Sequence, residues 1–202
     1  MCPKEQTSRS PGISQLPVMF RSRDLEAYGI PRDRLRTWFR RGDVIRLARG
    51  LYRIAGATAT ERETVAMVSA RIPQAIICLH SALHLHGIGT QAPRQVWIAL
   101  NGKTRKPKLQ DIPVRVVRFS GIMQRYGVLT WDIQGVTVRV TSPARTIVDC
   151  FRYRNKIGID IATEALQDAI RSGIATTGAI ARAAEVCRAR TVIRPYLEAM
   201  GQ

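Results

Sequence analysis

Acidic residues are scarce in this chain of 202 residues, which has 15 Asp and Glu against 32 Lys and Arg. The formal net charge of +17 at neutral pH indicates a polyanionic partner, and nucleic acid is the commonest one. The scarcity of acids also argues against a metal-dependent nuclease. Such an enzyme gathers carboxylates around its metal, and the sequence contains no grouping of the D…ExK kind.

Long apolar runs are missing as well. No stretch reaches the ~18 residues that a membrane span needs, and neither end forms an amphipathic, lysine-rich helix for a membrane surface. Residues 1–17 are polar and contain no apolar signal-peptide core, so we expect them to be flexible. We therefore expect a cytoplasmic protein that has no membrane partner.

Cysteine and histidine are few, and their spacing does not build a site. The four cysteines lie far apart and form no CxxC pair, so we expect reduced, mostly buried thiols rather than disulfides. His80 and His84 have the i, i+4 spacing of metal ligands on a helix, but no acidic ligand follows within reach. Packing beside a helix is the expected role of the histidines, and we expect neither a metal nor another cofactor.

Signatures of catalysis are absent too. Asp149 next to Cys150 has no histidine nearby in the sequence that would complete a catalytic dyad. Asn101–Thr104 carries the last letters of a phosphate-binding loop but lacks the glycine upstream, so we do not expect an enzyme. The basic loop Lys103–Lys108 has two interpretations: a solvated loop, or a second contact to phosphate or to an acidic protein surface.

What the chain has in excess is arginine, which is densest between Arg32 and Arg53, where eight arginines accompany two acids. The apolar residues of this stretch first repeat at helical spacing. After Gly42 they indicate two short strands around a tight turn. A basic helix followed by a basic hairpin is typical of a winged helix-turn-helix, which binds DNA.

Two helices joined at Gly29 form the predicted helix-turn-helix. Ser22 is the expected cap of a first helix over 22–28, and Gly29 ends that helix in the left-handed conformation. Pro31 suits the first turn of the second helix, 31–41. At about 100° per residue this helix places Leu35, Trp38 and Phe39 on its inner face.

The outer face of the second helix is the expected recognition surface. Its arginines can donate to guanine edges and phosphates, and Asp33 could accept from cytosine. A merely solvated face would mix charges of both signs and use lysine and glutamate, which this face does not. The predicted DNA-contacting residues of the helix-turn-helix are Ser22, Arg23, Arg32, Arg34, Arg36, Thr37, Arg40 and Arg41.

The hairpin after Gly42 is the predicted wing. Its strands, 44–47 and 51–54, pair across the turn formed by residues 48–50. A wing follows the DNA backbone or a minor groove, where arginine suits the narrow, negative groove. Arg46, Arg49 and Arg53 therefore complete the predicted DNA-binding set.

The remaining residues, 59–202, predict a second domain after a linker at 56–59. Strands are expected at 96–100, 114–119, 129–133 and 136–140, and the last two form a hairpin. Helices are expected from a capping box at 60–63, from a cap at Ser81 through His86, and at 142–153, 159–171, 176–188 and 190–200. The predicted fold class is α+β: a winged helix-turn-helix over 1–58, then a mixed domain with a helical C-terminal third.

The segment Ser22–Ile54 resembles the N-terminal winged-helix domain of AbiEi-type antitoxins, a type IV antitoxin family. That domain combines a short helix, a glycine, an arginine-rich helix, the pair RG, and a hairpin that ends in RGLY or RGVY. The corresponding residues here are Gly29, Arg41-Gly42 and residues 49–52, and the likeness covers roughly 18–56.

Two later segments resemble the C-terminal domain of the same family. SALHLHGIG, residues 81–89, is similar to the family's SALxxHGL helix. The segment Ser142–Ile170 is similar to a longer family pattern, and the residues that match it are Arg145, Thr146, Asp149, Arg152, Arg154, Asn155, Gly158 and Glu164. Together the matched regions touch most of the chain.

The resemblance implies a function in two parts. The N-terminal domain would repress its own operon by binding inverted-repeat DNA, with two copies on one repeat. The second domain would counteract a nucleotidyltransferase-like toxin, directly or indirectly, and its toxin-facing candidates are Arg145, Arg152, Arg154 and Lys156. One rival is a stand-alone winged-helix regulator whose second domain senses a ligand. The other is an enzyme such as a nuclease with a winged-helix anchor.

Overall fold

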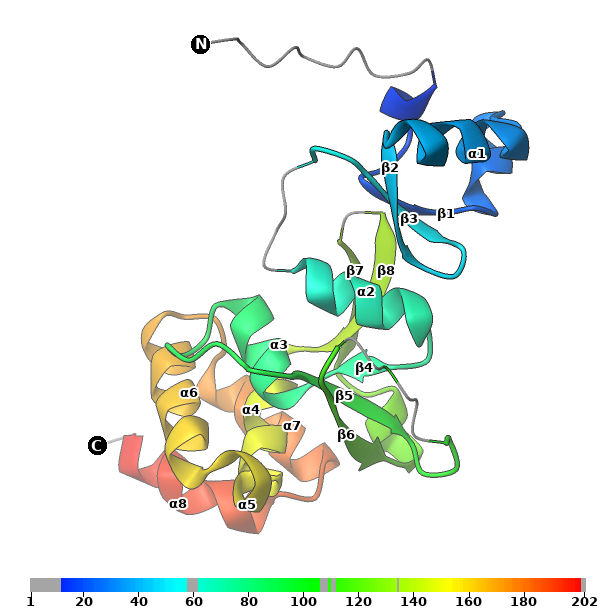
Figure 1. Ribbon diagram of the computed structural model, residues 1–202. Coiled ribbons are helices and arrows are strands. Elements are labelled where there is room, and N and C mark those ends of the chain that lie inside the picture. The colour runs from blue at the N-terminus through cyan, green and yellow to red at the C-terminus, as the bar shows by residue number, and fades with distance from the viewer. Residues whose placement is uncertain (1–11, 58–61, 106–108, 110–111, 134, 201–202) are drawn as a thin grey trace, which may run out of the picture. The chain divides into compact units, whose positions relative to one another are not determined.

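The computed structural model describes residues 12–57, 62–105, 109, 112–133 and 135–200 (Figure 1). The contacts between residues divide the chain into unit 1, Met1–Arg71 with Asp132–Thr137, and unit 2, Ile72–Trp131 with Val138–Gln202. The predicted boundary at residues 58–59 lies outside the described residues and stays a prediction. The α+β class is confirmed, because each unit combines helices with a sheet.

Unit 1 contains an antiparallel three-stranded sheet in the order β1-β3-β2. The strands are β1 (Met19–Arg21), β2 (Val44–Ala48) and β3 (Leu51–Ile54). The short 3-10 helix η2 (Asp24–Tyr28) and the helix α1 (Arg32–Arg41) lie between β1 and β2 in the chain. This is a winged helix, and the predicted β2–β3 hairpin is confirmed. The short strand β1 was not predicted.

The core of unit 1 lies between the helices and one face of this sheet. Leu25 of η2 and Trp38 of α1 pack with Phe20 and Ile54 of the sheet. Ile13 of the 3-10 helix η1 (Ile13–Gln15) joins the same core and is 1% exposed. The expectation that residues 1–17 are flexible is therefore wrong for residues 12–17, because apolar side chains anchor that segment. Residues 1–11 lie outside the described residues.

The turns of the helix-turn-helix confirm one part of the prediction and correct another. Gly29 and Gly42 end η2 and α1 with φ angles of 64° and 78°, in the left-handed region that glycine adopts without strain. Ser22 does not cap the first helix. Arg23 occupies the cap position, and the Ser22 backbone N–H donates to the Gly50 carbonyl at 3.0 Å instead.

The helix α2 (Glu63–Arg71) is fastened to the same sheet. Arg53 of β3 forms an ion pair with Glu63 at 3.4 Å, and Arg21 of β1 donates to the Ala70 carbonyl. Side chains alternate along a strand, so Arg21 and Arg53 point away from the face that carries Phe20 and Ile54. Two arginines thus hold both ends of α2 on the face opposite the winged-helix core. The capping-box residue at position 60 lies outside the described residues.

The hairpin tip Asp132–Thr137 also belongs to unit 1. Gly135 has a φ angle of 73°, and a Cβ atom there would come within 2.7 Å of the Met19 carbonyl oxygen. It would also collide with the Pro17 ring. Only glycine fits this close approach between two parts of the chain that are far apart in sequence.

Unit 2 is built on a five-stranded mixed sheet in the order β6-β5-β4-β8-β7. The short strand β4 (Ile76–Ile77) runs antiparallel to β5 (Val96–Asn101) and parallel to β8 (Val136–Thr141). The edges are β6 (Val114–Phe119), parallel to β5, and β7 (Val128–Ile133). The predicted strands are confirmed, with some ends moved by one residue.

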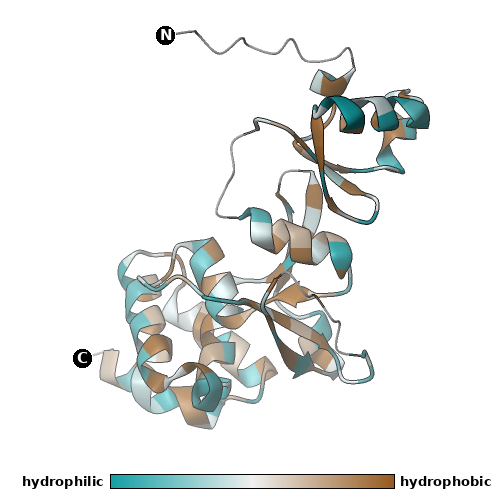
Figure 2. Ribbon diagram, in the orientation of Figure 1, coloured by the Kyte–Doolittle hydropathy of each residue, from teal (hydrophilic) through white to brown (hydrophobic). Residues whose placement is uncertain are grey.

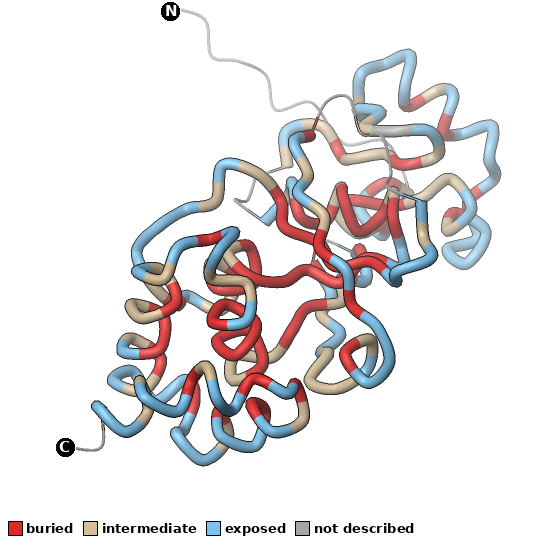
Figure 3. Tube along the Cα trace, turned by 90° about the horizontal axis from the view of Figure 1, so that it is seen from below, coloured by how far each residue is buried: buried red, intermediate tan, exposed pale blue. Residues whose placement is uncertain are grey.

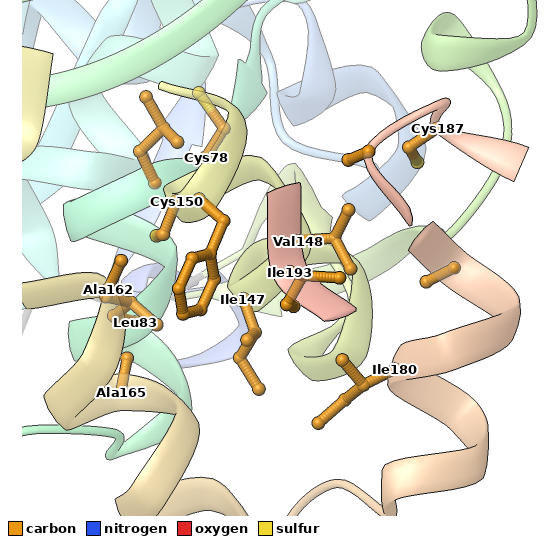
Figure 4. Close-up of a cluster of buried hydrophobic side chains, with 14 of the residues drawn as sticks. Cys78, Leu83, Ile147, Val148, Cys150, Ala162, Ala165, Ile180, Cys187 and Ile193 are labelled. Carbon is orange, nitrogen blue, oxygen red and sulfur yellow. The ribbon is translucent and has the colours of Figure 1, made fainter. Parts of the chain in front are cut away.

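The helix α4 (Pro143–Arg152) lies at the centre of unit 2 and packs against five other helices. These are α3 (Leu79–His86), α5 (Arg154–Ile157), α6 (Ile159–Arg171), α7 (Thr177–Val186) and α8 (Arg190–Met200). Buried positions concentrate where the helices meet, and outward turns are exposed (Figure 3). Small residues such as Ala162 and Ala165 lie beside Leu83 and Ile147, which lets the helices approach closely (Figure 4).

Two details of α3 correct the prediction for its start. The helix begins at Leu79, so Ser81 lies inside it and does not cap it. Ser81 is buried, and its hydroxyl accepts a hydrogen bond from the Trp97 N–H at 2.9 Å. The predicted cap at Ser81 is wrong because its hydroxyl is hydrogen-bonded to a residue of β5, which is distant in the sequence.

The histidines of α3 make ordinary packing and hydrogen-bond contacts. His80 Nε2 lies 3.1 Å from the Gln91 carbonyl, and His86 Nε2 lies 2.6 Å from the Thr141 carbonyl. Burial lowers the pKa of His80. In the described parts of the chain, no three His, Cys, Asp or Glu side chains gather as a metal site would require. None of the described helices is long and apolar enough to cross a membrane.

Candidate nucleic-acid interface

The helix α1 presents most of its surface to solvent. It follows Pro31 at the cap position and has only Leu35 and Trp38 buried along its ten residues. Phe39 is 52% exposed, so its predicted place on the inner face is wrong. Phe39 follows Trp38 by about 100° around the axis, which carries it past the edge of the narrow buried stripe.

Arginines dominate the exposed surface of α1, which appears hydrophilic along most of its length (Figure 2). Arg32 pairs with Glu26 of η2 at 3.4 Å, and both side chains are well exposed. Among the described residues, no ion pair is formed by Arg34, Arg36, Arg40 or Arg41. Asp33 is the one exposed acid on the helix, and Thr37 is half-buried. A concentrated positive field of this kind attracts phosphate.

The wing adds a second basic element to unit 1. Arg46 of β2 and Arg49 of the β2–β3 turn are exposed. The Ser22–Gly50 hydrogen bond ties this turn to the residue that follows β1. Arg23, at the start of η2, is exposed and lies 3.7 Å from Asp24. The predicted residues Arg23, Arg46 and Arg49 therefore lie at the surface, while Ser22 is half-buried.

Arg53 does not belong to the open surface of the wing. Its side chain is 16% exposed, its Nε atom faces Glu63, and its Nη2 atom donates to the Ala57 carbonyl at 2.6 Å. The predicted DNA contact by Arg53 is thus corrected: the guanidinium is committed to holding α2. Sequence spacing alone could not show this, because Glu63 comes from outside the hairpin.

Arg145 is likewise corrected, since it cannot face a toxin. Its side chain is fully buried in α4, where Nε donates to an oxygen of Asp149 at 2.8 Å. Its other nitrogens donate to the carbonyls of Tyr126 at 2.7 Å and Met123 at 3.3 Å, and the guanidinium lies over the Phe119 ring. Arg145 therefore organises the core of unit 2.

Burial beside Arg145 leaves Asp149 incompletely hydrogen-bonded and changes its pKa. One of its oxygens has no hydrogen-bond partner among the described residues, although the carboxyl is fully buried. Burial raises the pKa of Asp149 to about 6, against the lowering effect of Arg145. The adjacent thiols of Cys78 and Cys150 are buried, and burial raises the pKa of each. Both cysteines are core residues, and a raised pKa disfavours the thiolate form of each.

The other predicted toxin-facing residues lie at or near the surface of unit 2. Arg152 is exposed while donating to the Cys187 carbonyl at 2.6 Å. Lys156 is exposed, and its amine lies 5.6 Å from the centre of the Tyr153 ring. Arg154 is half-buried and donates to the Phe151 carbonyl at 3.2 Å.

Other basic residues of unit 2 continue this surface. The Tyr153 hydroxyl donates to the Arg118 carbonyl at 2.8 Å, which brings the end of β6 beside α5. Arg118 in turn donates to the carbonyls of Asn101 and Thr104, at the base of the predicted basic loop. Lys103 and Arg105 of that loop are exposed, and residues 106–108 lie outside the described residues.

Residues 13–55 match the family model described as "Transcriptional regulator, AbiEi antitoxin". The match covers the N-terminal segment of the chain and none of unit 2. The matched segment begins at η1 and ends just after β3, so it contains both α1 and the wing. The arginine-rich surface thus lies within the segment that matches this family model.

The solved structures extend the comparison beyond this domain. The crystal structure of the RV2827C protein from Mycobacterium tuberculosis aligns with a TM-score of 0.51 and 17% sequence identity. The alignment covers 84% of this chain and 67% of that chain. At this identity the likeness shows a shared fold alone. No curated protein matches this chain.

Proposed function

We propose that this protein is the antitoxin of a toxin–antitoxin system, which counteracts a nucleotidyltransferase-like toxin and represses its own operon. The observation that carries the proposal is α1, whose arginines project into solvent beside a basic wing in the segment that matches AbiEi antitoxin regulators. Neither activity requires catalysis. The protein would act in the cytoplasm, where its operator lies.

The dimensions of α1 suit recognition of double-stranded DNA. A helix about 10–12 Å across fits the major groove, which is about 12 Å wide. Arg36 and Arg40, on the outer face, would donate to guanine edges, and Asp33 would accept from cytosine. Arg46 and Arg49 of the wing would contact the flanking backbone or minor groove. Two copies would occupy the two halves of an inverted repeat.

Unit 2 supplies the surface for the toxin in this proposal. Arg152 and Lys156 are exposed, so they offer positive charge to an acidic protein surface. The buried Arg145 supports these residues only indirectly, by holding α4 in place.

The DNA-binding half is tested with DNA from upstream of the protein's own gene. Nuclease footprinting should show two protected half-sites related by inversion, at protein concentrations where unrelated DNA of equal length stays unprotected. Uniform protection of both DNAs would mean non-specific phosphate binding and would contradict autorepression. Measurements at several salt concentrations are needed, because phosphate contacts make the affinity salt-dependent.

The antitoxin half is tested by co-expression with the toxin encoded beside this gene. The wild-type chain should restore growth, and a variant with Arg36→Ala and Arg40→Ala should still restore it. Charge reversal by Arg152→Glu and Lys156→Glu should abolish the rescue, provided that the variant accumulates to wild-type levels. Loss of rescue in the first variant and its survival in the second would place neutralisation in unit 1.

A second candidate function is favoured by one groove in unit 2. The groove has a volume of about 360 Å³ and lies between α7 and α8, with Ala184, Ile193 and Leu197 in its lining. The ion pairs Arg190–Glu185 and Arg194–Glu198 lie along it. A stand-alone regulator could bind a ligand there. A gene with no nucleotidyltransferase-like neighbour would favour this alternative, and a toxin gene beside it would favour the antitoxin.

A further inference from the structure

The wing of unit 1 contains a β-bulge at Leu47. Arg46 pairs with Tyr52 and Ala48 pairs with Leu51, so Leu47 is an extra residue on β2 with no register partner on β3. A bulge bends the strand and removes one residue from the ladder of backbone hydrogen bonds. The conformation of the wing beyond the bulge therefore depends on contacts other than the ladder.

One such contact comes from α2. Arg71, the last residue of that helix, donates from Nη2 to the Leu47 carbonyl at 2.7 Å, and Arg71 is only partly exposed. Charged donors form the stronger class of hydrogen bond, and this one holds the carbonyl that the bulge displaces. The helix that carries Arg71 is itself fixed on the sheet through the Arg53–Glu63 ion pair and the bond from Arg21 to the Ala70 carbonyl.

The other side of the wing is held separately. The Ser22 N–H bonds to the Gly50 carbonyl, one residue after Arg49. The turn that carries Arg49 is thus fixed by Ser22, and the strand that leads into it is fixed by Arg71. An arginine gains DNA affinity from such anchoring, since less side-chain and loop freedom is lost when it binds.

We propose that Arg71 is a positioning residue for the wing: it holds the bulge at Leu47 and thereby presents Arg46 and Arg49 to DNA without touching DNA itself. This inference rests on the proposed DNA-binding function. It adds that the DNA affinity of the winged helix depends on a side chain outside residues 13–55, the segment shared with the family model.

The test is a double-mutant cycle on full-length protein, with the operator fragment that footprinting defines. Arg71→Met keeps the apolar stem and removes the guanidinium, and it should weaken operator binding about tenfold at fixed salt, the usual scale for removing one charged hydrogen bond. Arg71→Lys retains a charged donor, so it should bind the operator with more than half of the wild-type affinity. Arg182→Met removes an exposed arginine from α7 and should bind like the wild type.

The decisive readout is the effect of Arg49→Ala in two backgrounds. In the wild type this substitution should weaken binding, and in the Arg71→Met background it should have little further effect, because the wing is already displaced. Equal effects in both backgrounds would overturn the proposal, since Arg71 would then act independently of the wing. A merely stabilising role predicts the same equality.

Hydrogen exchange separates the remaining outcomes. If Arg71→Met does not fold, Arg71→Gln, which has no charged donor, is compared with the wild type, and the amides of residues 44–54 should exchange faster while those of unit 2 do not. Unchanged exchange in this segment would overturn the proposal. A wild-type protein that binds no operator specifically would instead contradict the proposed function, and the exchange experiment would still test the role of Arg71.

Discussion

The helices α1 and α4 have the same length, ten residues, and use arginine in opposite ways. In α1 two residues are buried and the arginines project into solvent. In α4 seven consecutive residues, 145–151, are buried, and Arg145 at their start is surrounded by an aspartate and two carbonyls. The net charge of a chain therefore does not say how many of its arginines can reach a partner.

The difference is one of solvation. An exposed arginine keeps its water until a phosphate or a base replaces it, so it stays available for binding. A buried arginine has already lost its water, and only a complete set of acceptors makes its burial tolerable. Arg145 belongs to the second kind. Arg21 and Arg53 are partly buried and are held in contacts within unit 1, although all three arginines contribute to the net charge of +17.

The largest effect is expected from removing the buried arginine. Arg145→Ala should lower the free energy of unfolding by about 3–5 kcal/mol, because it leaves Asp149 as an uncompensated buried charge. Urea denaturation of full-length protein measures this change. Arg182→Ala on α7 is the exposed control and should change stability by less than about 0.5 kcal/mol. Similar changes in unfolding free energy for the two variants would contradict the different roles given to the buried and the exposed arginine.

The second prediction concerns the pH dependence of the same pair. Asp149 has a raised pKa of about 6 in the folded protein, against an ordinary value of 3.8. The unfolded carboxyl therefore loses its proton first as the pH rises, and the contribution of Asp149 to stability falls through this window. The fall is on the order of 3 kcal/mol, from about 1.4 kcal/mol per pKa unit.

Denaturation of the wild type and of Asp149→Asn at several pH values between about 4 and 7 isolates this contribution. The stability of the wild type relative to the variant should decrease as the pH rises, and it should level off above pH 6. A difference that is constant, or that increases with pH, would show that the Arg145 guanidinium outweighs burial in setting the pKa of Asp149.

The third prediction addresses the exposed arginines of α1. The double substitution Arg36→Ala and Arg40→Ala should weaken operator binding at fixed salt, by roughly 1–3 kcal/mol for each arginine that recognises a base. The unfolding free energy should stay within about 0.5 kcal/mol of the wild type, because neither side chain is buried. Titration of a labelled operator and urea denaturation provide the two values. Unchanged operator affinity would remove α1 from the recognition surface.

The smallest effect separates two arginines of the wing hairpin. Arg49→Ala should reduce the slope of log affinity against log salt by about 0.9, the value for one phosphate contact. Arg53→Ala should leave this slope unchanged and instead lower stability by about 1 kcal/mol, because it breaks the partly buried contact with Glu63. If Arg53→Ala changed the salt slope and Arg49→Ala changed only the stability, Arg53 would be the DNA contact and Arg49 would have a structural role.

Local patterns were sufficient to predict much of this fold. Apolar residues at helical spacing predicted α1, and alternation around Gly50 predicted the wing. The helices 159–171 and 190–200 have their predicted bounds, since capping and breaking residues lie next to them in the sequence. These features depend on residues within one or two turns of each other, which the sequence displays directly.

What the sequence did not reveal depends on contacts between distant segments. The strand β1 has three residues and becomes visible only through its pairing with β3. Arg53 and Arg145 looked like surface residues because their partners, Glu63 and the Met123 and Tyr126 carbonyls, are supplied by the fold. One signal was present: Arg145 and Asp149 have opposite charge at i, i+4 within an otherwise apolar helix.

The close approach of Gly135 to Met19 has a consequence for synthesis of the protein. Unit 1 includes Asp132–Thr137, so its last piece leaves the ribosome long after the winged-helix segment. Unit 1 is therefore completed only after residues 72–131 of unit 2 have been translated. A chain truncated before residue 132 would contain α1 but would lack the segment Asp132–Thr137 of unit 1. Completion of the unit that carries the arginine-rich surface therefore depends on translation of the chain as far as residue 137.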